Sequence, residues 1–269
     1  MTHLEVTERF VETTSGPKVR IVEAGEGPTC VFLPGLLGVV AHYEETLALL
    51  QQRARCLVFD PNLLELPREF CNLDAVTKAI NEVISREELG PATLIGNSFG
   101  GHVALLTALE RPELVRGLVL AGSSGLAERT YEKDVQHRPS KPWLRRKIGE
   151  IFSDPDYNVE EFVEHAYREL TNPRKALAMV KLGRSTKQRH LGHLLPKITA
   201  PTLVLWGEDD EITNGEAARQ FTRLIPDSRL KWIPDCGHAP MLERPAAFAA
   251  GIEAFLDHLD QVDQEDAAA

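Results

Sequence analysis

The chain has 269 residues, of which 43% are hydrophobic and 26% are charged, and its formal net charge is −10 at pH 7. This composition is typical of a globular protein with a sizeable core, and the negative charge argues against nucleic acid as a partner. No apolar run approaches the roughly 20 residues that cross a bilayer, and the N-terminus lacks signal-peptide character, so we expect a cytoplasmic protein that uses no membrane.

Short apolar runs alternate along the chain with longer segments of helical periodicity, which predicts βαβ units stacked into a mostly parallel sheet. Several runs are apolar throughout, as expected for strands that are buried on both faces. The expected strands are residues 19–22, 30–33, 56–59, 93–95, 118–120, 203–206 and 230–233. The expected helices are residues 43–52, 73–89, 102–110, 216–224 and 246–259.

Residues 125–196 interrupt this alternation, because they contain no convincing strand and many charges. Their pattern predicts several short helices separated by prolines. The prolines are Pro139, Pro142, Pro155 and Pro173. We therefore expect a core formed by residues 1–124 and 197–269, and a helical insertion at 125–196, called the insertion below. The acidic and alanine-rich tail from Gln261 is expected to be frayed.

A glycine-rich segment, Gly96-Asn97-Ser98-Phe99-Gly100-Gly101, follows one expected strand directly and precedes a helical pattern. It matches G-x-S-x-G in the context that this motif requires. The glycines allow a sharp turn from strand to helix, so that the serine projects into the open, and the new helix adds a partial positive charge nearby. Ser98 is therefore the predicted nucleophile.

A serine hydroxyl needs an adjacent base, and the base needs a carboxylate that fixes its tautomer. His238 is the predicted base, because it lies between Gly237 and Pro240 in a loop just past the last expected strand. Asp210 is the predicted acid, because a glycine turn and two spacer residues let its side chain fold back toward the end of the sheet. Asp209 is the alternative.

Acyl transfer also requires donors for a developing oxyanion. The main-chain N–H of Phe99, directly after the nucleophile, is one predicted donor. The N–H of Leu36, in the loop after the expected strand 30–33, is the other. The alternative for this loop is a plain turn that contains Pro34 and Gly35.

The four cysteines are widely spaced and form no C-x-x-C pair, so we expect reduced, packed thiols. They are Cys30, Cys56, Cys71 and Cys236. Carboxylates and histidines do not cluster with the spacing of metal ligands, so neither a metal nor a cofactor is expected.

Four segments in this order resemble the α/β-hydrolase superfamily over nearly the whole chain. They are Phe32–Gly35, Gly96–Gly101, Leu203–Asp210 and Cys236–Pro240. The resemblance implies an α/β-hydrolase fold, with a mostly parallel eight-stranded sheet, flanking helices and a helical cap formed by the insertion. A serine at the nucleophile position argues against haloalkane dehalogenases and epoxide hydrolases, which carry aspartate there.

The Gly-Asn-Ser elbow is similar to that of meta-cleavage product hydrolases, which cut carbon-carbon bonds in dienoic diketo acids. This resemblance implies that Asn97 and a cap arginine contact substrate, with Arg184 as the counterpart and Arg189 as its alternative. Two positions depart from that subclass: Pro34 replaces the usual histidine, and Ala239 stands where tryptophan is frequent.

The sequence therefore predicts a serine hydrolase that uses Ser98, His238 and Asp210 on a small or medium acyl substrate, most simply a carboxylic ester. The protein is expected to act as a monomer or homodimer. Two alternatives stay open: a carbon-carbon bond hydrolase with the same triad, and a receptor-like ligand-binding protein with weak turnover.

Overall fold

A sheet of eight strands forms the centre of the computed structural model, which describes residues 4–14, 16–126 and 139–268. The strands are β1 (Thr7–Val11), β2 (Val19–Ala24), β3 (Thr29–Leu33), β4 (Arg55–Asp60), β5 (Ala92–Asn97), β6 (Val115–Ala121), β7 (Thr202–Gly207) and β8 (Ser228–Ile233). Their order is β1-β2-β4-β3-β5-β6-β7-β8. The β1-β2 and β2-β4 pairs are antiparallel and all others are parallel, which confirms the predicted architecture.

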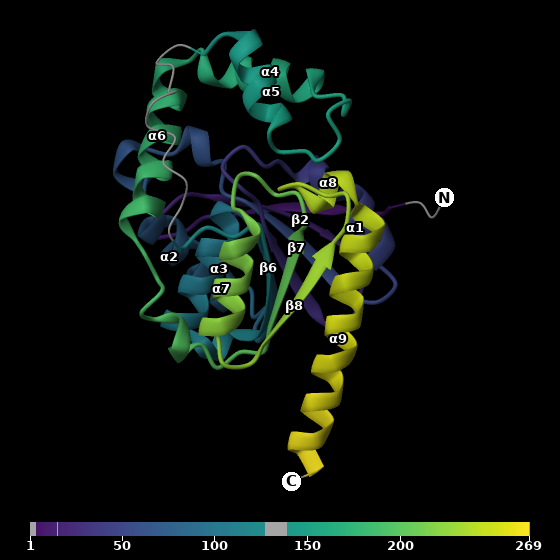
Figure 1. The fold of residues 1–269 in the computed structure, drawn as a ribbon. Coiled ribbons are helices and arrows are strands. Elements are labelled where there is room, and N and C mark those ends of the chain that lie inside the picture. The colour runs from purple at the N-terminus through teal and green to yellow at the C-terminus, as the bar shows by residue number, and fades with distance from the viewer. Residues whose placement is uncertain (1–3, 15, 127–138, 269) are drawn as a thin grey trace.

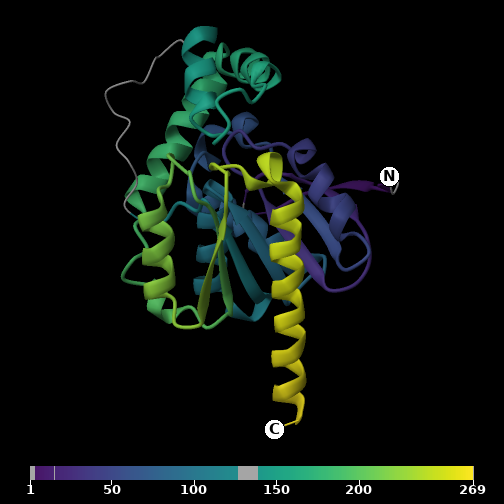
Figure 2. The same ribbon diagram turned by 45° about the vertical axis from the view of Figure 1, so that its right-hand side comes forward.

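Helices cover both faces of this sheet (Figure 1). The helices of the sheet layers are α1 (Glu44–Leu50), α2 (Leu73–Arg86), α3 (Phe99–Glu110), α7 (Gly215–Leu224), α8 (Pro240–Glu243) and α9 (Pro245–Ala268). Helices α1 and α9 lie on one face, whereas α2, α3 and α7 lie on the other (Figures 1 and 2). The sheet therefore separates two apolar layers.

Strand β3 shows why the central strands are apolar throughout. Its Val31 and Leu33 belong to the core layer that contains α2 and α3, whereas Cys30 and Phe32 belong to the layer that contains α1 and α9. Successive side chains of a strand point to opposite faces, so a strand covered on both sides needs apolar residues at every position.

Within its described residues, the insertion contains the α-helices α4 (Lys141–Gly149), α5 (Glu160–Leu170) and α6 (Pro173–Gln188). Helices α4 and α5 lie beyond the end of the sheet near which α8 begins (Figure 1). Its described residues, 139–196, contain no strand; residues 127–138 lie outside the described part of the chain. Pro142 and Pro173 lie in first turns, where the missing N–H costs no helical bond.

Three local predictions need correction. Strand β1 was not expected, because this edge strand is largely exposed and has no apolar pattern. Helix α3 begins at Phe99, three residues earlier than predicted. Helix α9 continues to Ala268 instead of fraying from Gln261.

Ion pairs give a physical reason for the longer α9. Arg53 and Arg116 both bond to Asp260, at 2.5 and 2.6 Å, and Arg116 also bonds to Asp263 at 2.6 Å. These ion pairs lie in the polar C-terminal part of α9 and connect it to Arg53, just before β4, and to Arg116 in β6.

The four cysteines are free and buried, as predicted. Within residues 4–14, 16–126 and 139–268, no helix combines the length and the apolar character that spanning a membrane requires.

Candidate active site

The turn between β5 and α3 holds Ser98 in a strained conformation, with φ 53° and ψ −114°. Non-glycine residues rarely adopt positive φ, and such strain is concentrated at functional sites. Two glycines make the turn possible. A Cβ on Gly100 would lie 1.9 Å from the main-chain oxygen of Leu33, and one on Gly96 would lie 2.4 Å from the Cα of Gly101. The start of α3 thus packs directly against the end of β3.

His238 and Asp210 form a buried pair, with 2.9 Å between Nδ1 of the histidine and Oδ2 of the aspartate. The main-chain N–H groups of Ile212 and Thr213 both donate to Asp210 Oδ1 at 2.9 Å. The Thr213 hydroxyl donates to Oδ2, also at 2.9 Å. Two main-chain N–H groups and one hydroxyl therefore donate to this carboxylate, and together they fix its orientation toward the imidazole.

Of the two carboxylates proposed for the acid, Asp210 contacts His238 and Asp209 does not. Asp209 is exposed, and its Oδ2 accepts a hydrogen bond of 2.7 Å from the Ser153 hydroxyl. The two neighbouring side chains therefore leave the loop after β7 in different directions.

Asn97 connects the serine turn to the histidine loop. Its Nδ2 donates to the main-chain oxygens of Ala121 and His238, both at 3.0 Å. Ser98 N–H also donates to Ala121 O, at 3.1 Å. Both amide hydrogens of Asn97 are therefore used within the protein, which leaves only Oδ1 for a ligand, so its substrate contact stays a prediction.

Gly122, with φ 53°, provides the space in which the histidine and aspartate meet. A Cβ at this position would lie 2.7 Å from His238 Nδ1 and 3.0 Å from Asp210 Oδ2. The end of β6 therefore needs a glycine for two reasons: the left-handed backbone conformation and the closeness of the imidazole.

The predicted oxyanion donors lie on two adjoining segments. Phe99 is the first residue of α3, so its N–H has no acceptor within the helix. A Cβ on Gly35 would lie 3.4 Å from the Cβ of Ser98, which places the loop containing Leu36 beside the serine. In the described part of the chain, neither the Leu36 nor the Phe99 N–H donates to another protein group.

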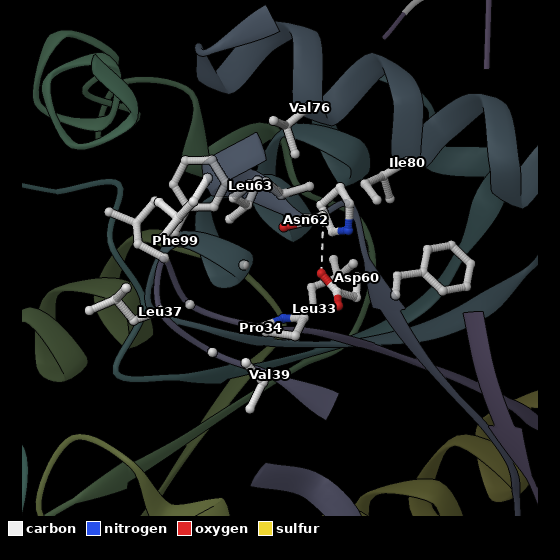
Figure 3. Close-up of a pocket in the computed structure, with 18 of the residues that line it drawn as sticks. Leu33, Pro34, Leu37, Val39, Asp60, Asn62, Leu63, Val76, Ile80 and Phe99 are labelled. Atoms are coloured by element: carbon white, nitrogen blue, oxygen red, sulfur yellow. Dashed lines mark hydrogen bonds between the residues drawn. The ribbon is translucent and has the colours of Figure 1, made fainter. Parts of the chain in front are cut away.

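A cavity of about 100 Å³ lies beside this loop (Figure 3). Leu36, Phe99 and Gly100 line it, but Ser98 and His238 do not. Its apolar wall includes Phe59, Leu63, Val76, Ile80 and Val103. Its titratable lining residues are Asp60, His165 and Glu169, and Asp60 Oδ1 accepts from Asn62 N–H at 2.8 Å (Figure 3).

Neither Arg184 nor Arg189 lines this cavity. Arg184 is exposed on α6, one residue after Gly183, where a Cβ would approach Leu36 Cδ1 to 3.9 Å. Arg189 lies 3.6 Å from the Asp74 carboxylate. The substrate contact of Arg184 therefore also stays a prediction.

Two histidines near the site were not assigned a role from sequence. His102 is buried beneath the serine turn, and its Nδ1 lies 3.3 Å from the hydroxyl of Ser124, which donates to Ser98 O. His42 packs edge-on against Phe162 of α5. Burial lowers the pKa of each imidazole to about 4, so both are neutral at pH 7. Their burial depends on contacts between distant segments, which leave no local signal in the sequence.

Among the described residues, no group of three or more His, Cys, Asp or Glu side chains is arranged to hold a metal ion. Asn97 links the turn that carries Ser98 to the loop that carries His238, and the side chain of His238 pairs with Asp210.

This fold, with helices on both faces of a mostly parallel eight-stranded sheet, is that of the α/β hydrolases. The chain belongs to the alpha/beta hydrolase family, whose model matches residues 30–251. It is 28% identical to 2-hydroxy-6-oxo-6-(2'-aminophenyl)hexa-2,4-dienoic acid hydrolase of Metapseudomonas resinovorans, over 93% of this chain and 90% of that protein.

A second relative is the pimeloyl-[acyl-carrier protein] methyl ester esterase of Neisseria meningitidis, 28% identical over 62% of this chain and 69% of that protein. Among solved structures, a serine hydrolase involved in carbazole degradation is similar with a TM-score of 0.79 and 26% identity, over 94% of this chain and 99% of that one. The family thus includes relatives named as dienoic acid hydrolases and as esterases, so these names do not fix the substrate.

Proposed function

We propose that this protein is a serine hydrolase that cleaves carboxylic esters of small or medium acyl groups. The observation that carries this proposal is the buried His238–Asp210 pair, joined through Asn97 to the strained turn that presents Ser98. A buried base oriented by a carboxylate, next to a serine on such a turn, is the arrangement that activates a hydroxyl nucleophile.

The reaction uses these groups in order. Asp210 holds the proton of His238 on Nδ1, so Nε2 accepts the proton of Ser98 as its oxygen attacks the ester carbonyl. The N–H groups of Leu36 and Phe99 stabilise the oxyanion. Collapse expels the alcohol, which takes the proton from Nε2, and leaves an acyl-enzyme. Water, deprotonated by Nε2, then attacks the acyl carbon and releases the acid and the serine.

The insertion would act as the cap of this site. Support comes from α5, whose His165 and Glu169 line the cavity, and from Ile151, whose main-chain oxygen accepts the N–H of His238 at 2.7 Å. Segments that cover a site in this way exclude water and strengthen its electrostatic interactions.

Labelling with a fluorophosphonate tests the nucleophile directly. We expect one covalent adduct on the wild-type protein and none on Ser98→Ala, measured by mass spectrometry of the intact protein. Ser123→Ala is the matched control, because Ser123 is buried next to the same turn and donates to Ser124 O. This control should be labelled like the wild type.

Two outcomes of this experiment contradict the proposal. An adduct that persists on Ser98→Ala would assign the reactive group to another residue. A folded wild-type protein without any adduct would favour the ligand-binding alternative, in which the triad does not turn over.

Carbon-carbon bond cleavage is the second candidate function, favoured by the dienoic acid hydrolase among the relatives. The cavity favours an ester instead. Among the residues that the structure describes, its lining includes two carboxylates, Asp60 and Glu169, and neither lysine nor arginine, so this described lining gives a carboxylate-bearing dienoate no cationic partner. We expect a p-nitrophenyl ester of a short acyl group to have the higher kcat/KM, compared with a vinylogous diketo acid. The reverse order would assign the carbon-carbon reaction.

A further inference from the structure

Glu243, in the short helix α8, has a buried side chain that no step of the proposed reaction uses. Its carboxylate accepts three main-chain N–H groups from two separate segments. Oε2 accepts from Gly237 at 2.6 Å, next to the histidine. Oε1 accepts from Ser153 at 2.7 Å and from Asp154 at 2.9 Å, both in the insertion.

The same two segments also contact each other directly. His238 N–H donates to Ile151 O at 2.7 Å, and a Cβ on Gly237 would lie 2.3 Å from that oxygen. On its other side, His238 O accepts from Asn97 Nδ2. The main chain of His238 is therefore hydrogen-bonded to the serine turn on one side and to the turn of residues 151–154 on the other. Glu243 bonds to both partners of the second contact: to the turn of residues 151–154 and to Gly237 in the histidine loop.

We propose that Glu243 is a positioning residue for His238, and that it makes the histidine loop and residues 151–154 of the insertion move as one unit. This inference rests on the proposed function of His238 as the base. Hydrogen bonds to an ionised acceptor are about twice as strong as neutral ones, and a buried N–H left without a partner destabilises the protein. Any movement of the insertion relative to residues 237–238 therefore requires a hinge outside residues 151–154 or the loss of these hydrogen bonds.

Glu243→Gln keeps the size of the side chain but cannot accept hydrogen bonds from both segments at once. An amide has one oxygen and one NH₂ group, so it can accept from Gly237 or from the Ser153 and Asp154 pair, but its NH₂ then faces the other donors. A catalytic group displaced by about 1 Å can cost about 10²-fold in rate. We therefore expect fluorophosphonate labelling and kcat on a p-nitrophenyl ester to fall about 10- to 100-fold, with KM changed less than twofold.

Glu82→Gln is the matched control. Glu82 also accepts a main-chain N–H, that of Thr14, at 2.8 and 3.0 Å to its two oxygens, but it lies on α2 and ties this helix to the segment after β1. Its variant should lose stability without losing more than about twofold in labelling rate. A similar fall in both variants would show that only general stability is affected and would overturn the proposal.

Amide hydrogen exchange tests the positioning role with a readout other than activity. We expect Glu243→Gln to speed exchange at Gly237, His238, Ser153 and Asp154, and Glu82→Gln to leave these amides unchanged. Unchanged exchange in a folded Glu243→Gln protein overturns the positioning role. A wild-type protein that resists labelling while Glu243→Gln still speeds exchange contradicts the proposed function and supports the structural coupling.

Glu243→Asp provides a second variant in case the glutamine protein does not fold. It keeps the negative charge but is shorter by one methylene, so it cannot reach both segments. We expect labelling and exchange to change in the same direction as in Glu243→Gln. A wild-type labelling rate in Glu243→Asp would show that the charge, and not the bonding to two segments, matters, and would overturn the proposal.

Discussion

Asp210→Asn is expected to lower kcat for ester hydrolysis by about 10⁴-fold, the loss known for the corresponding change in serine proteases. The hydrogen bonds around the carboxylate determine how the amide must sit. The N–H groups of Ile212 and Thr213 both donate to Oδ1, so the amide oxygen takes that place. The NH₂ group then faces His238 Nδ1, which must accept a hydrogen bond. The proton of the imidazole moves to Nε2, and the base can no longer accept the proton of Ser98.

The measurement is kcat on a p-nitrophenyl ester for Asp210→Asn and for Asp209→Asn as the neighbouring control. Asp209 is exposed and does not contact the histidine, so we expect its variant to keep most of the wild-type kcat. Thermal unfolding of both variants shows whether the loop after β7 is intact. A larger loss in Asp209→Asn than in Asp210→Asn would contradict the proposed assignment of the acid.

The sheet could be predicted from sequence because its central strands are buried on both faces. Each such strand appears as an apolar run, as β3 and β5 illustrate. The same argument explains what was missed. Strand β1 pairs only with β2 at the edge of the sheet and exposes Phe10 to 56%, so its residues carry no apolar period. Helix α9 extends further than its apolar pattern because of ion pairs to distant arginines, which no local pattern can indicate.

The candidate site shows the same division between local and distant contacts. The serine turn could be predicted because its glycines and its position between strand and helix are contiguous in sequence. The roles of Thr213, Gly122 and Glu243 could not, because each depends on a side chain or main-chain group brought close only by the fold. Asn97 was predicted as a substrate contact from resemblance, but its Nδ2 is bonded to main-chain oxygens of two other segments.

Gly100→Ala is expected to destabilise the protein by about 3 kcal/mol and to reduce fluorophosphonate labelling strongly. The added Cβ would lie 1.9 Å from Leu33 O, 2.4 Å from Leu33 C and 2.7 Å from Pro34 O. All three atoms belong to the main chain, which cannot rotate away as a flexible side chain can. Relief therefore requires α3 to move away from β3, and the N–H of Phe99 then separates from the loop that carries Leu36.

Gly149→Ala is the control, because a Cβ at Gly149 of α4 would meet no atom within 4 Å. Alanine is favoured over glycine in a helix by about 1 kcal/mol, so this variant should be as stable as the wild type or slightly more stable. The free energy of unfolding from urea titration, with the labelling rate measured on the same samples, distinguishes the two positions. A Gly100→Ala protein with wild-type stability and wild-type labelling would mean that α3 does not pack closely against β3. A stable variant with reduced labelling would mean that the fold can absorb the shift of α3 but the oxyanion donors cannot.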